Sequence, residues 1–202
     1  RVPIIQNSLS LTVRYGLILR TLFYNKGLAC LRLNNYSYPA MSSPFKTIAL
    51  IGKHKNPEIV APLLRLGQYL QSRNLEVLLD CLTASEVAAT AYPALALEEI
   101  GVRADLAIVL GGDGTMLNIA RKLAPFDVPL VGINQGRLGF LTDRSIDTML
   151  ETVGAMLDGR YVTERRMLLS AEVIRSEASV FGALALNDVA VNRGSGGSMI
   201  EF

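Results

Sequence analysis

Asp113 stands in a glycine-rich turn, Gly111-Gly112-Asp113-Gly114-Thr115, where a carboxylate meets backbone amides that no large side chain shields. A glycine turn at a helix N-terminus offers N–H groups and the positive end of the helix dipole, both of which suit phosphate oxygens. A carboxylate repels such an anion unless it holds a bridging divalent cation or accepts a proton from an attacking hydroxyl. The turn therefore predicts a phosphate site with Asp113 as its reactive group. The alternative is that Asp113 only caps the helix.

The elements around this turn follow from the hydrophobic pattern. Residues 106–110 are all apolar, as in a parallel strand buried on both faces. Helical spacing follows the turn, and Asp113 and Thr115 are both residues that can cap that helix. The sequence thus predicts a strand, a glycine turn and a helix N-terminus in immediate succession.

A second polar loop follows the next buried strand. The apolar run 128–133 leads directly into residues 134–143, Asn-Gln-Gly-Arg-Leu-Gly-Phe-Leu-Thr-Asp. Ligands of open parallel sheets bind beyond the carboxyl ends of strands, so we expect both loops at one edge of the sheet. The alternative is that Asn134 and Gly136 only make a turn and that Phe140 and Leu141 belong to the core.

The remaining N-terminal pattern alternates strands with helices. Strands are expected at 46–52 and 75–80, and a helix is expected to begin near Pro57. The alanine-rich segment 81–103 is expected to be helical in pieces, broken near Pro93 and ended by Gly101. Ser145 is expected to cap a last helix that closes at Gly159. This alternation predicts a parallel, doubly wound α/β domain.

After residue 159 the pattern changes to strands without intervening helices. Residues 166–175 and 181–193 read as strands joined by a turn at 176–180, and 198–202 reads as the start of another strand. The sequence therefore predicts that an all-β second domain begins here and that the chain is truncated. The expected domains are a leader at 1–40 outside the fold, an α/β domain at 41–160 and the first β-domain strands at 161–202.

The charge is unevenly distributed. Residues 1–40 contain five basic residues and no acidic ones, which leaves 15 basic against 18 acidic residues, a net charge of −3, in 41–202. The basic leader resembles an organelle transit peptide, or is upstream sequence translated before a start at Met41. The balance of the rest does not favour nucleic-acid binding. Arg20 interrupts the best apolar run, so no membrane span is predicted.

Composition and motifs speak against several common catalytic sites. His54 is the only histidine, which leaves little material for a Ser–His–Asp triad or a histidine-ligated metal. Neither the P-loop pattern nor the G-x-G-x-x-G dinucleotide fingerprint occurs. Cys30 and Cys81 have no metal or redox spacing, and reduced thiols in a cytoplasmic protein are expected.

Three motifs together resemble the NAD kinase family of the bacterial type. GGDGT at 111–115 is shared with a wider superfamily that includes lipid kinases and phosphofructokinases. INQGRLGFLTD at 133–143 is similar to the more specific second motif of the NAD kinases. Asn187-Asp188 resembles their third motif, an asparagine followed by an acid on a strand that enters the second domain. The three occur in the family's order, and the resemblance covers residues from about 46 to 202.

The resemblance implies transfer of the γ-phosphoryl group of ATP to the 2′-hydroxyl of the adenosine ribose of NAD, giving NADP. Asp113 would accept the proton of that hydroxyl and Gly114 would contact the dinucleotide, while Asn187 and Asp188 would hold substrate hydroxyls. Mg²⁺ would bridge phosphate oxygens. The phosphate-binding residues would be Gly111, Gly112, Gly114 and Thr115, and the adjoining pocket would be shaped by Leu138, Gly139, Phe140 and Leu141.

Two rival functions and one departure accompany this resemblance. A lipid kinase would share GGDGT, and a non-catalytic nucleotide-binding fragment would share the fold. The family's later Gly-Ser/Thr-Thr-Ala-Tyr loop, which completes the NAD site, is absent from these 202 residues, so the chain is expected to be inactive alone. A homo-oligomer is expected for the full-length form.

Overall fold

The computed structural model describes residues 9–13, 17–33, 44–87, 92–136, 139, 141–142 and 144–190. The chain divides into two compact units, a larger one of residues 28–166 and a smaller one of residues 1–27 and 167–202. The larger unit therefore begins and ends at other residues than the expected α/β domain at 41–160.

The larger unit is built on a parallel sheet with the strand order β2-β7-β6-β3-β4-β5, and β8 also pairs with β7. The strands that lie wholly in this unit are β3 (Thr47–Gly52), β4 (Glu76–Asp80), β5 (Ala94–Leu95), β6 (Leu106–Leu110), β7 (Leu130–Asn134) and β8 (Arg144–Ser145). From β3, in the middle of this order, the chain moves outward through β4 and β5 and then returns to β6 on the other side of β3. The order reverses between β3 and β6, which makes their carboxyl ends the switch point where ligands bind in such sheets.

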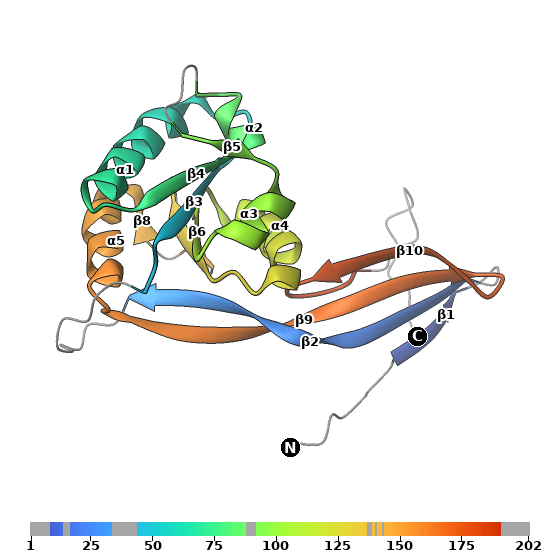
Figure 1. Ribbon diagram of the computed structural model, residues 1–202. Coiled ribbons are helices and arrows are strands. Elements are labelled where there is room, and N and C mark those ends of the chain that lie inside the picture. Colours follow the sequence, from blue (N-terminus) through green and yellow to red (C-terminus); the bar gives the residue numbers. More distant parts are fainter. Residues whose placement is uncertain are drawn as a thin grey trace. The chain divides into compact units, whose positions relative to one another are not determined.

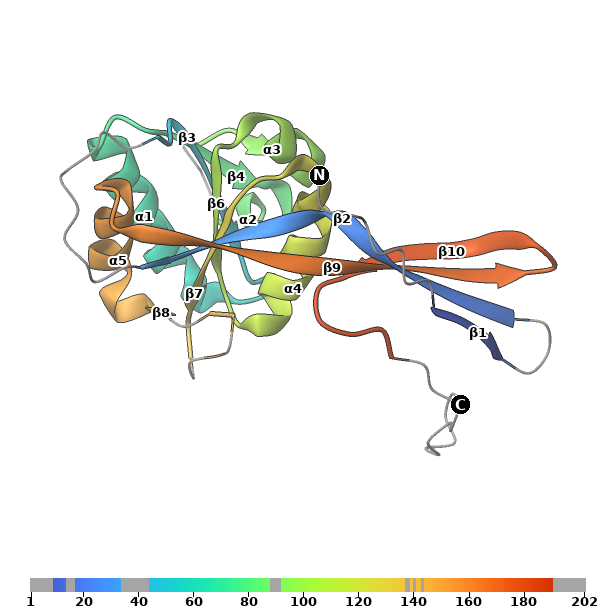
Figure 2. The same cartoon turned by 90° about the horizontal axis from the view of Figure 1, so that it is seen from below.

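Helices cover both faces of this sheet, which confirms the predicted doubly wound α/β fold. α1 (Val60–Ser72) and α5 (Met149–Leu157) lie over one face, and α3 (Leu97–Arg103) and α4 (Asp113–Leu123) lie over the other (Figures 1 and 2). The short helix α2 (Cys81–Ala84) follows β4, and single 3₁₀ turns occur at η1 (Pro57–Ile59), η2 (Ala124–Phe126) and η3 (Ile146–Thr148). No helix among the described residues has the length and apolar character that a membrane crossing requires.

The strands are apolar on both faces because both faces are covered. Every residue of β6 and β7 is buried. On one face, Ile48 and Leu50 of β3 pack in a cluster with Leu63 of α1 and Val153 of α5. This is the burial that continuous apolar runs predict for parallel strands.

Local signals place most helix ends correctly. Ser145 caps η3, where its hydroxyl accepts a hydrogen bond from the Asp147 amide at 3.2 Å. Gly159 follows α5 with a φ of 85°, a conformation that glycine adopts without strain. Gly101 does not end α3, which continues to Arg103. A Cβ at Gly101 would lie 2.4 Å from the ring of Phe126, so close packing explains this glycine.

The segment before residue 40 differs from the expected leader. β2 (Leu17–Leu33) reaches the larger unit, where Leu28–Leu31 is buried and Cys30 pairs in parallel with Leu130 of β7. Residues 28–31 therefore belong to the fold. The physical reason is that β7 offers an edge to a further strand, and this run of Leu, Ala, Cys and Leu can be buried there.

The smaller unit contains two antiparallel strand pairs, of which the pair after residue 160 was predicted and the pair before residue 28 was not. β1 (Leu9–Val13) pairs with β2, and β10 (Ala178–Ala185) pairs with β9 (Tyr161–Arg175). The β9–β10 turn is Ser176 and Glu177, whose positive φ values of 49° and 65° suit a two-residue hairpin. The expected turn at 176–180 was therefore too long. β10 ends at Ala185 and not at residue 193, and the strand expected at 198–202 lies outside the described residues.

Candidate active site

The candidate site lies at the carboxyl ends of β3, β6 and β7, where backbone hydrogen bonds join the three strand ends. The Lys53 amide donates to the Leu110 carbonyl at 2.9 Å, and the Gly111 amide donates to the Ile133 carbonyl at 2.9 Å. The glycine turn after β6 therefore sits between the loops that follow β3 and β7. The prediction that the two polar loops share one edge of the sheet is confirmed.

Asp113 is held by the loop after β7. Its Oδ1 accepts hydrogen bonds from the Leu141 amide at 3.1 Å, the Thr142 amide at 3.0 Å and the Thr142 hydroxyl at 2.9 Å. The N-cap position of α4 belongs to Gly112, and Asp113 is the first helical residue. The side chain is half-buried and does not turn into the interior. Helix capping therefore does not account for how this carboxylate is bound.

Gly139 allows the loop to approach the carboxylate closely. A Cβ at this position would lie 2.2 Å from Asp113 Oδ1 and 2.5 Å from its Cγ, so any larger residue would collide with the acid. The Gly139 amide donates to the Thr142 carbonyl at 3.0 Å and closes the turn. Gly139 is thus next to Asp113, while Leu138 and Phe140 lie outside the described residues.

The glycines of the turn differ in their surroundings. A Cβ at Gly111 would lie 2.8 Å from the Thr115 hydroxyl oxygen, so Thr115 covers this glycine. A Cβ at Gly112 or at Gly114 would have no neighbour within 4 Å. The backbone at Gly112 and Gly114 thus borders open space at the N-terminus of α4, as an anion-binding turn requires. Arg121 and Lys122 in the last turn complement the opposite end of the helix dipole.

Two functional candidates, Asn134 and Thr142, received no role from the sequence, although both stand in the 133–143 motif. Asn134 Oδ1 accepts a hydrogen bond from the Gly136 amide at 2.7 Å, so the asparagine does shape the turn. Its Nδ2 also donates to the Thr142 hydroxyl oxygen at 2.7 Å. Both residues are buried. The signal that could have found them is two polar residues placed where the pattern demands burial.

A cationic loop, Lys53-His54-Lys55, follows β3 beside the glycine turn. The Glu86 carboxylate holds it by accepting from the Lys55 amide and from the Asn56 amide, the latter at 3.2 Å, and it lies 2.8 Å from His54 Nδ1. These groups, with the Lys55 amide first, lower the pKa of Glu86 below its ordinary value. No motif or periodic pattern in the sequence marked this loop as part of the site.

Asn56 ties the cationic loop to the loop after β7. Its Nδ2 donates to Gln135 Oε1 at 2.6 Å. The loops that follow β3, β6 and β7 are therefore fixed to one another.

Comparison with known proteins identifies this arrangement. The family model of the ATP-NAD kinase N-terminal domain matches residues 48–161, which include β3 from its second residue on, the glycine turn and the loop that binds Asp113. The chain belongs to the NAD kinase family. It is 76% identical over 162 residues to an NAD kinase of Nitrosospira multiformis and 64% identical over 161 residues to one of Nitrosomonas europaea.

These alignments include 80% of this chain but 55% and 54% of the two relatives, so the chain spans about half the length of the curated NAD kinases it matches. A crystal structure of yeast NADH kinase complexed with NADH aligns with a TM-score of 0.60 at 17% identity, covering 89% of this chain and 52% of that one. At that identity the likeness shows a shared fold.

Asn187-Asp188, the pair that resembles the third NAD kinase motif, lies in the smaller unit. Asn187 and Asp188 are exposed and follow the end of β10, so they are not on a strand as the sequence predicted. Ser179 and Phe181 mark an irregularity in the β9–β10 register, so the hairpin that leads to this pair is not regular.

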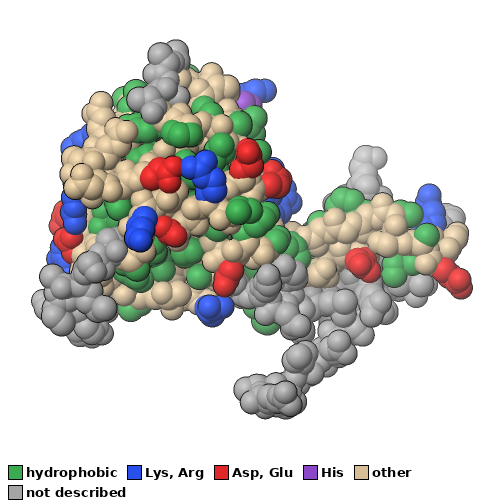
Figure 3. Space-filling view, viewed as in Figure 1, with side chains coloured by type: hydrophobic (Ala, Val, Ile, Leu, Met, Phe, Trp, Pro, Cys, Tyr) green, Lys and Arg blue, Asp and Glu red, His purple; other side chains and the backbone are tan. Residues whose placement is uncertain are grey.

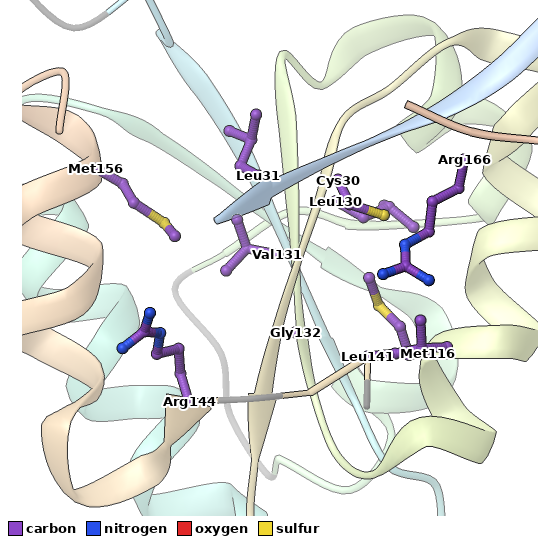
Figure 4. Close-up of a pocket in the computed structure, with 10 residues that line it drawn as sticks. All are labelled: Cys30, Leu31, Met116, Leu130, Val131, Gly132, Leu141, Arg144, Met156 and Arg166. Atoms are coloured by element: carbon purple, nitrogen blue, oxygen red, sulfur yellow. The ribbon is translucent and has the colours of Figure 1, made fainter. Parts of the chain in front are cut away.

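Leu141 also borders a small cavity in the larger unit. Figure 4 shows it with Met116 and with two arginines, Arg144 and Arg166, among apolar and sulfur-containing side chains. The cavity measures about 10 Å³, enough for about one water molecule. It is too small for a nucleotide, so this cavity is not the pocket predicted for residues 138–141.

Charged groups on one face of the larger unit are mixed in sign. On the face seen in Figure 3, acidic and basic side chains alternate over the elements of this unit. Among the described residues, no three His, Cys, Asp or Glu side chains gather as a metal-binding group. Asp113 is the acid that the glycine turn itself contributes.

Proposed function

We propose that the full-length protein transfers the γ-phosphoryl group of ATP to the 2′-hydroxyl of the adenosine ribose of NAD, with Asp113 as the base. One observation carries this proposal: the Asp113 carboxylate is half-exposed at the switch point and is held there by another loop. Membership of the NAD kinase family supports the substrate assignment. The way in which this carboxylate is held fits the role of a proton acceptor better than the role of a helix cap.

In the reaction, the ribose 2′-oxygen forms a bond to the γ-phosphorus while the bond from that phosphorus to the β–γ bridging oxygen breaks. The hydroxyl proton passes to Asp113, and ADP leaves with the bridging oxygen. The transition state is loose, so positioning and electrostatic stabilisation supply most of the acceleration. The amides at the start of α4 and the cationic loop after β3 would stabilise charge on the phosphates.

The remaining site residues are part of the same proposal. Gly111, Gly112, Gly114 and Thr115 would line the phosphates, and Gly114 would also contact the dinucleotide. Asn187 and Asp188, with the β-strands after residue 160, would hold substrate hydroxyls in the second domain. Residues 138–141 would border the base.

Mg²⁺ fits this arrangement, because it takes one or two carboxylates together with substrate phosphates. The open backbone at Gly112 and Gly114 leaves room for phosphates beside Asp113. When bound, the ion would neutralise charge on the phosphate oxygens. We place the full-length protein in the cytoplasm as a homo-oligomer, and the location agrees with Cys30 and Cys81 remaining thiols.

The test is an acceptor assay on the full-length protein with ATP and Mg²⁺. NADP formation from NAD is expected, NADH serves as a second acceptor, and diacylglycerol tests the lipid kinase rival. Phosphorylation of diacylglycerol without NADP formation would overturn the proposal.

The 202-residue chain is assayed in parallel. We expect no substantial turnover from it, because it spans about half of its relatives' length. Calorimetric binding of NAD without turnover would mark the chain as a nucleotide-binding fragment. NADP formation at the full-length rate would show that the second domain is dispensable.

A further inference from the structure

The hydroxyl of Thr142 joins the proposed base to the sheet. It lies 2.9 Å from Asp113 Oδ1 and 2.7 Å from Asn134 Nδ2. We propose that Thr142, oriented by Asn134, is a positioning residue that holds Asp113 where it meets the acceptor hydroxyl. This inference rests on the proposed function and deepens it.

The chemistry of the groups fixes the direction of each hydrogen bond. The Gly136 amide can only donate, so the Asn134 atom that it contacts at 2.7 Å is the carbonyl oxygen. The other Asn134 atom is therefore the NH₂ group, which can only donate to the Thr142 hydroxyl oxygen. The single hydroxyl hydrogen of Thr142 is then directed to Asp113 Oδ1. Asn134 thus sets the rotor of Thr142.

The chain of hydrogen bonds starts from a rigid element. Asn134 is the last residue of β7. The methyl group of Thr142 packs over Gly132 of the same strand, where an added Cβ would lie 2.7 Å from it. Thr142 is fully buried, so water does not compete for the hydrogen bonds of its hydroxyl group. Asp113 is therefore placed relative to the parallel sheet and not by its own helix.

This placement matters because the Asp113 side chain could also adopt a rotamer that bonds to its own helix. An aspartate in the first helical turn can bend back towards amides of that turn, since Asp side chains readily bond to nearby backbone. Three donors on Oδ1 oppose such a rotation. A displacement of the reacting groups by about 1 Å can cost about a hundredfold in rate.

The test compares Thr142→Val with Thr142→Ser in the full-length protein, measuring kcat and KM for NAD together with melting temperature. Valine keeps the methyl that packs on Gly132 and loses the hydroxyl, whereas serine keeps the hydroxyl and loses the methyl. We expect kcat to fall about 10- to 100-fold in Thr142→Val with KM changed less than about threefold. Thr142→Ser should keep kcat within about threefold of wild type.

Two further variants separate positioning from general damage. Thr152→Val removes another buried threonine hydroxyl, on α5, and should leave kcat unchanged. Adding Thr142→Val to Asp113→Asn should lower kcat no further, because the hydroxyl acts through Asp113. Equal kcat losses in the Val and Ser variants, or a full additional loss in the double variant, would overturn the inference.

The failure of this inference can be told from the failure of the proposed function. If Asp113→Asn abolishes turnover but Thr142→Val is fully active, only the positioning role is lost. If Asp113→Asn itself retains wild-type kcat, Asp113 is not the base and the inference falls with it.

Discussion

Two Asp–Thr pairs lie at carboxyl ends of strands in the same parallel sheet, and they are built differently. After β4, Asp80 Oδ2 accepts from the amide of Thr83 at 3.2 Å and from its hydroxyl at 3.3 Å. The partners are three residues apart, and Asp80 caps α2. After β6, Asp113 accepts equivalent bonds from Thr142, 29 residues away.

The two pairs also differ in exposure. Asp80 and Thr83 are both buried, so their pairing serves the fold. Thr142 is buried but Asp113 is only half-buried, so its carboxylate is fixed on one side and accessible on the other. The local pair, Asp80–Thr83, bonds a free amide at the start of a helix. The remote clamp, by which we mean the bonds from Thr142 to Asp113, holds a carboxylate that a ligand can reach. The comparison suggests that stability and catalysis can be separated by mutating the two pairs in parallel.

The largest expected difference between the pairs is in kcat when the aspartate of each pair is replaced by asparagine. In the full-length protein, Asp113→Asn is expected to lower kcat by about 10² to 10⁴, since a positioned general base contributes about that much. Asp80→Asn keeps a side-chain oxygen that can still cap α2, so kcat should stay within about twofold. Steady-state NADP formation measures both.

Thermal unfolding of the same two variants provides the control. Asp113→Asn should keep its melting temperature near that of wild type, because an amide oxygen can accept the same hydrogen bonds. Near-wild-type turnover in Asp113→Asn, or an equal kcat loss in Asp80→Asn, would show that the contrast between the pairs is not functional.

A methyl group at Gly139 should disturb the remote clamp specifically. In Gly139→Ala the new Cβ would press on the Asp113 carboxylate, so the acid must move and kcat should fall by about tenfold or more. Gly101→Ala is the matched control, since the nearest atoms that its Cβ would meet belong to the Phe126 ring, at 2.4 Å, and not to an acid. That variant should lose about 1–3 kcal/mol of stability and keep kcat.

The kinetics and the melting curves of the two alanine variants decide this prediction together. Full activity in Gly139→Ala would mean that the loop can retreat without moving Asp113. The distances that define the clamp would then not govern catalysis.

Contacts between residues near one another in the chain could be predicted from the sequence, whereas individual contacts between distant residues could not. Strands and helix ends such as Gly159 were recognisable from short patterns. The Asp80–Thr83 pair is local in the same way, although it was not singled out in the sequence. The glycine turn and the polar loop after β7 were placed at one edge because parallel strands end there together. The bond from Thr142 to Asp113 was not predictable, because it depends on how Leu141 and Thr142 pack against Gly132 of β7.

Other misses have the same origin in tertiary context. Gly101 was taken for a helix end, but its role is set by a ring from another element. Residues 28–31 were placed outside the fold because their charge pattern looked foreign, yet four small or apolar residues suffice to pair at the β7 edge. The β9–β10 turn was drawn too long because Ser176 and Glu177 are not the usual residues of a two-residue hairpin.

Mutating the local pair, Asp80–Thr83, should change the stability of the protein and not its activity. Thr83 Oγ1 accepts from the Gly52 amide at 2.8 Å in addition to bonding Asp80, so Thr83→Val removes two hydrogen bonds at a buried position. We expect a loss of about 1–3 kcal/mol in the free energy of unfolding. Urea denaturation measures it, and kcat of the full-length variant should change less than about twofold. A large kcat loss at unchanged stability would reverse the assignment of the two pairs.

Glu86 offers the mildest test, because it too is held by amides of a distant loop but is not the proposed base. Its pKa is lowered in the folded protein, chiefly by the Lys55 amide, so the stabilisation is present above the ordinary glutamate pKa. That stabilisation is lost as pH falls through the lowered folded value. We therefore expect the difference in melting temperature between wild type and Glu86→Gln to shrink steadily as pH is lowered from 7 through the carboxylate range. Glu151→Gln on α5 serves as the exposed control. A difference in melting temperature that does not change with pH would show that the bonds from Glu86 to the cationic loop do not depend on the charge of Glu86.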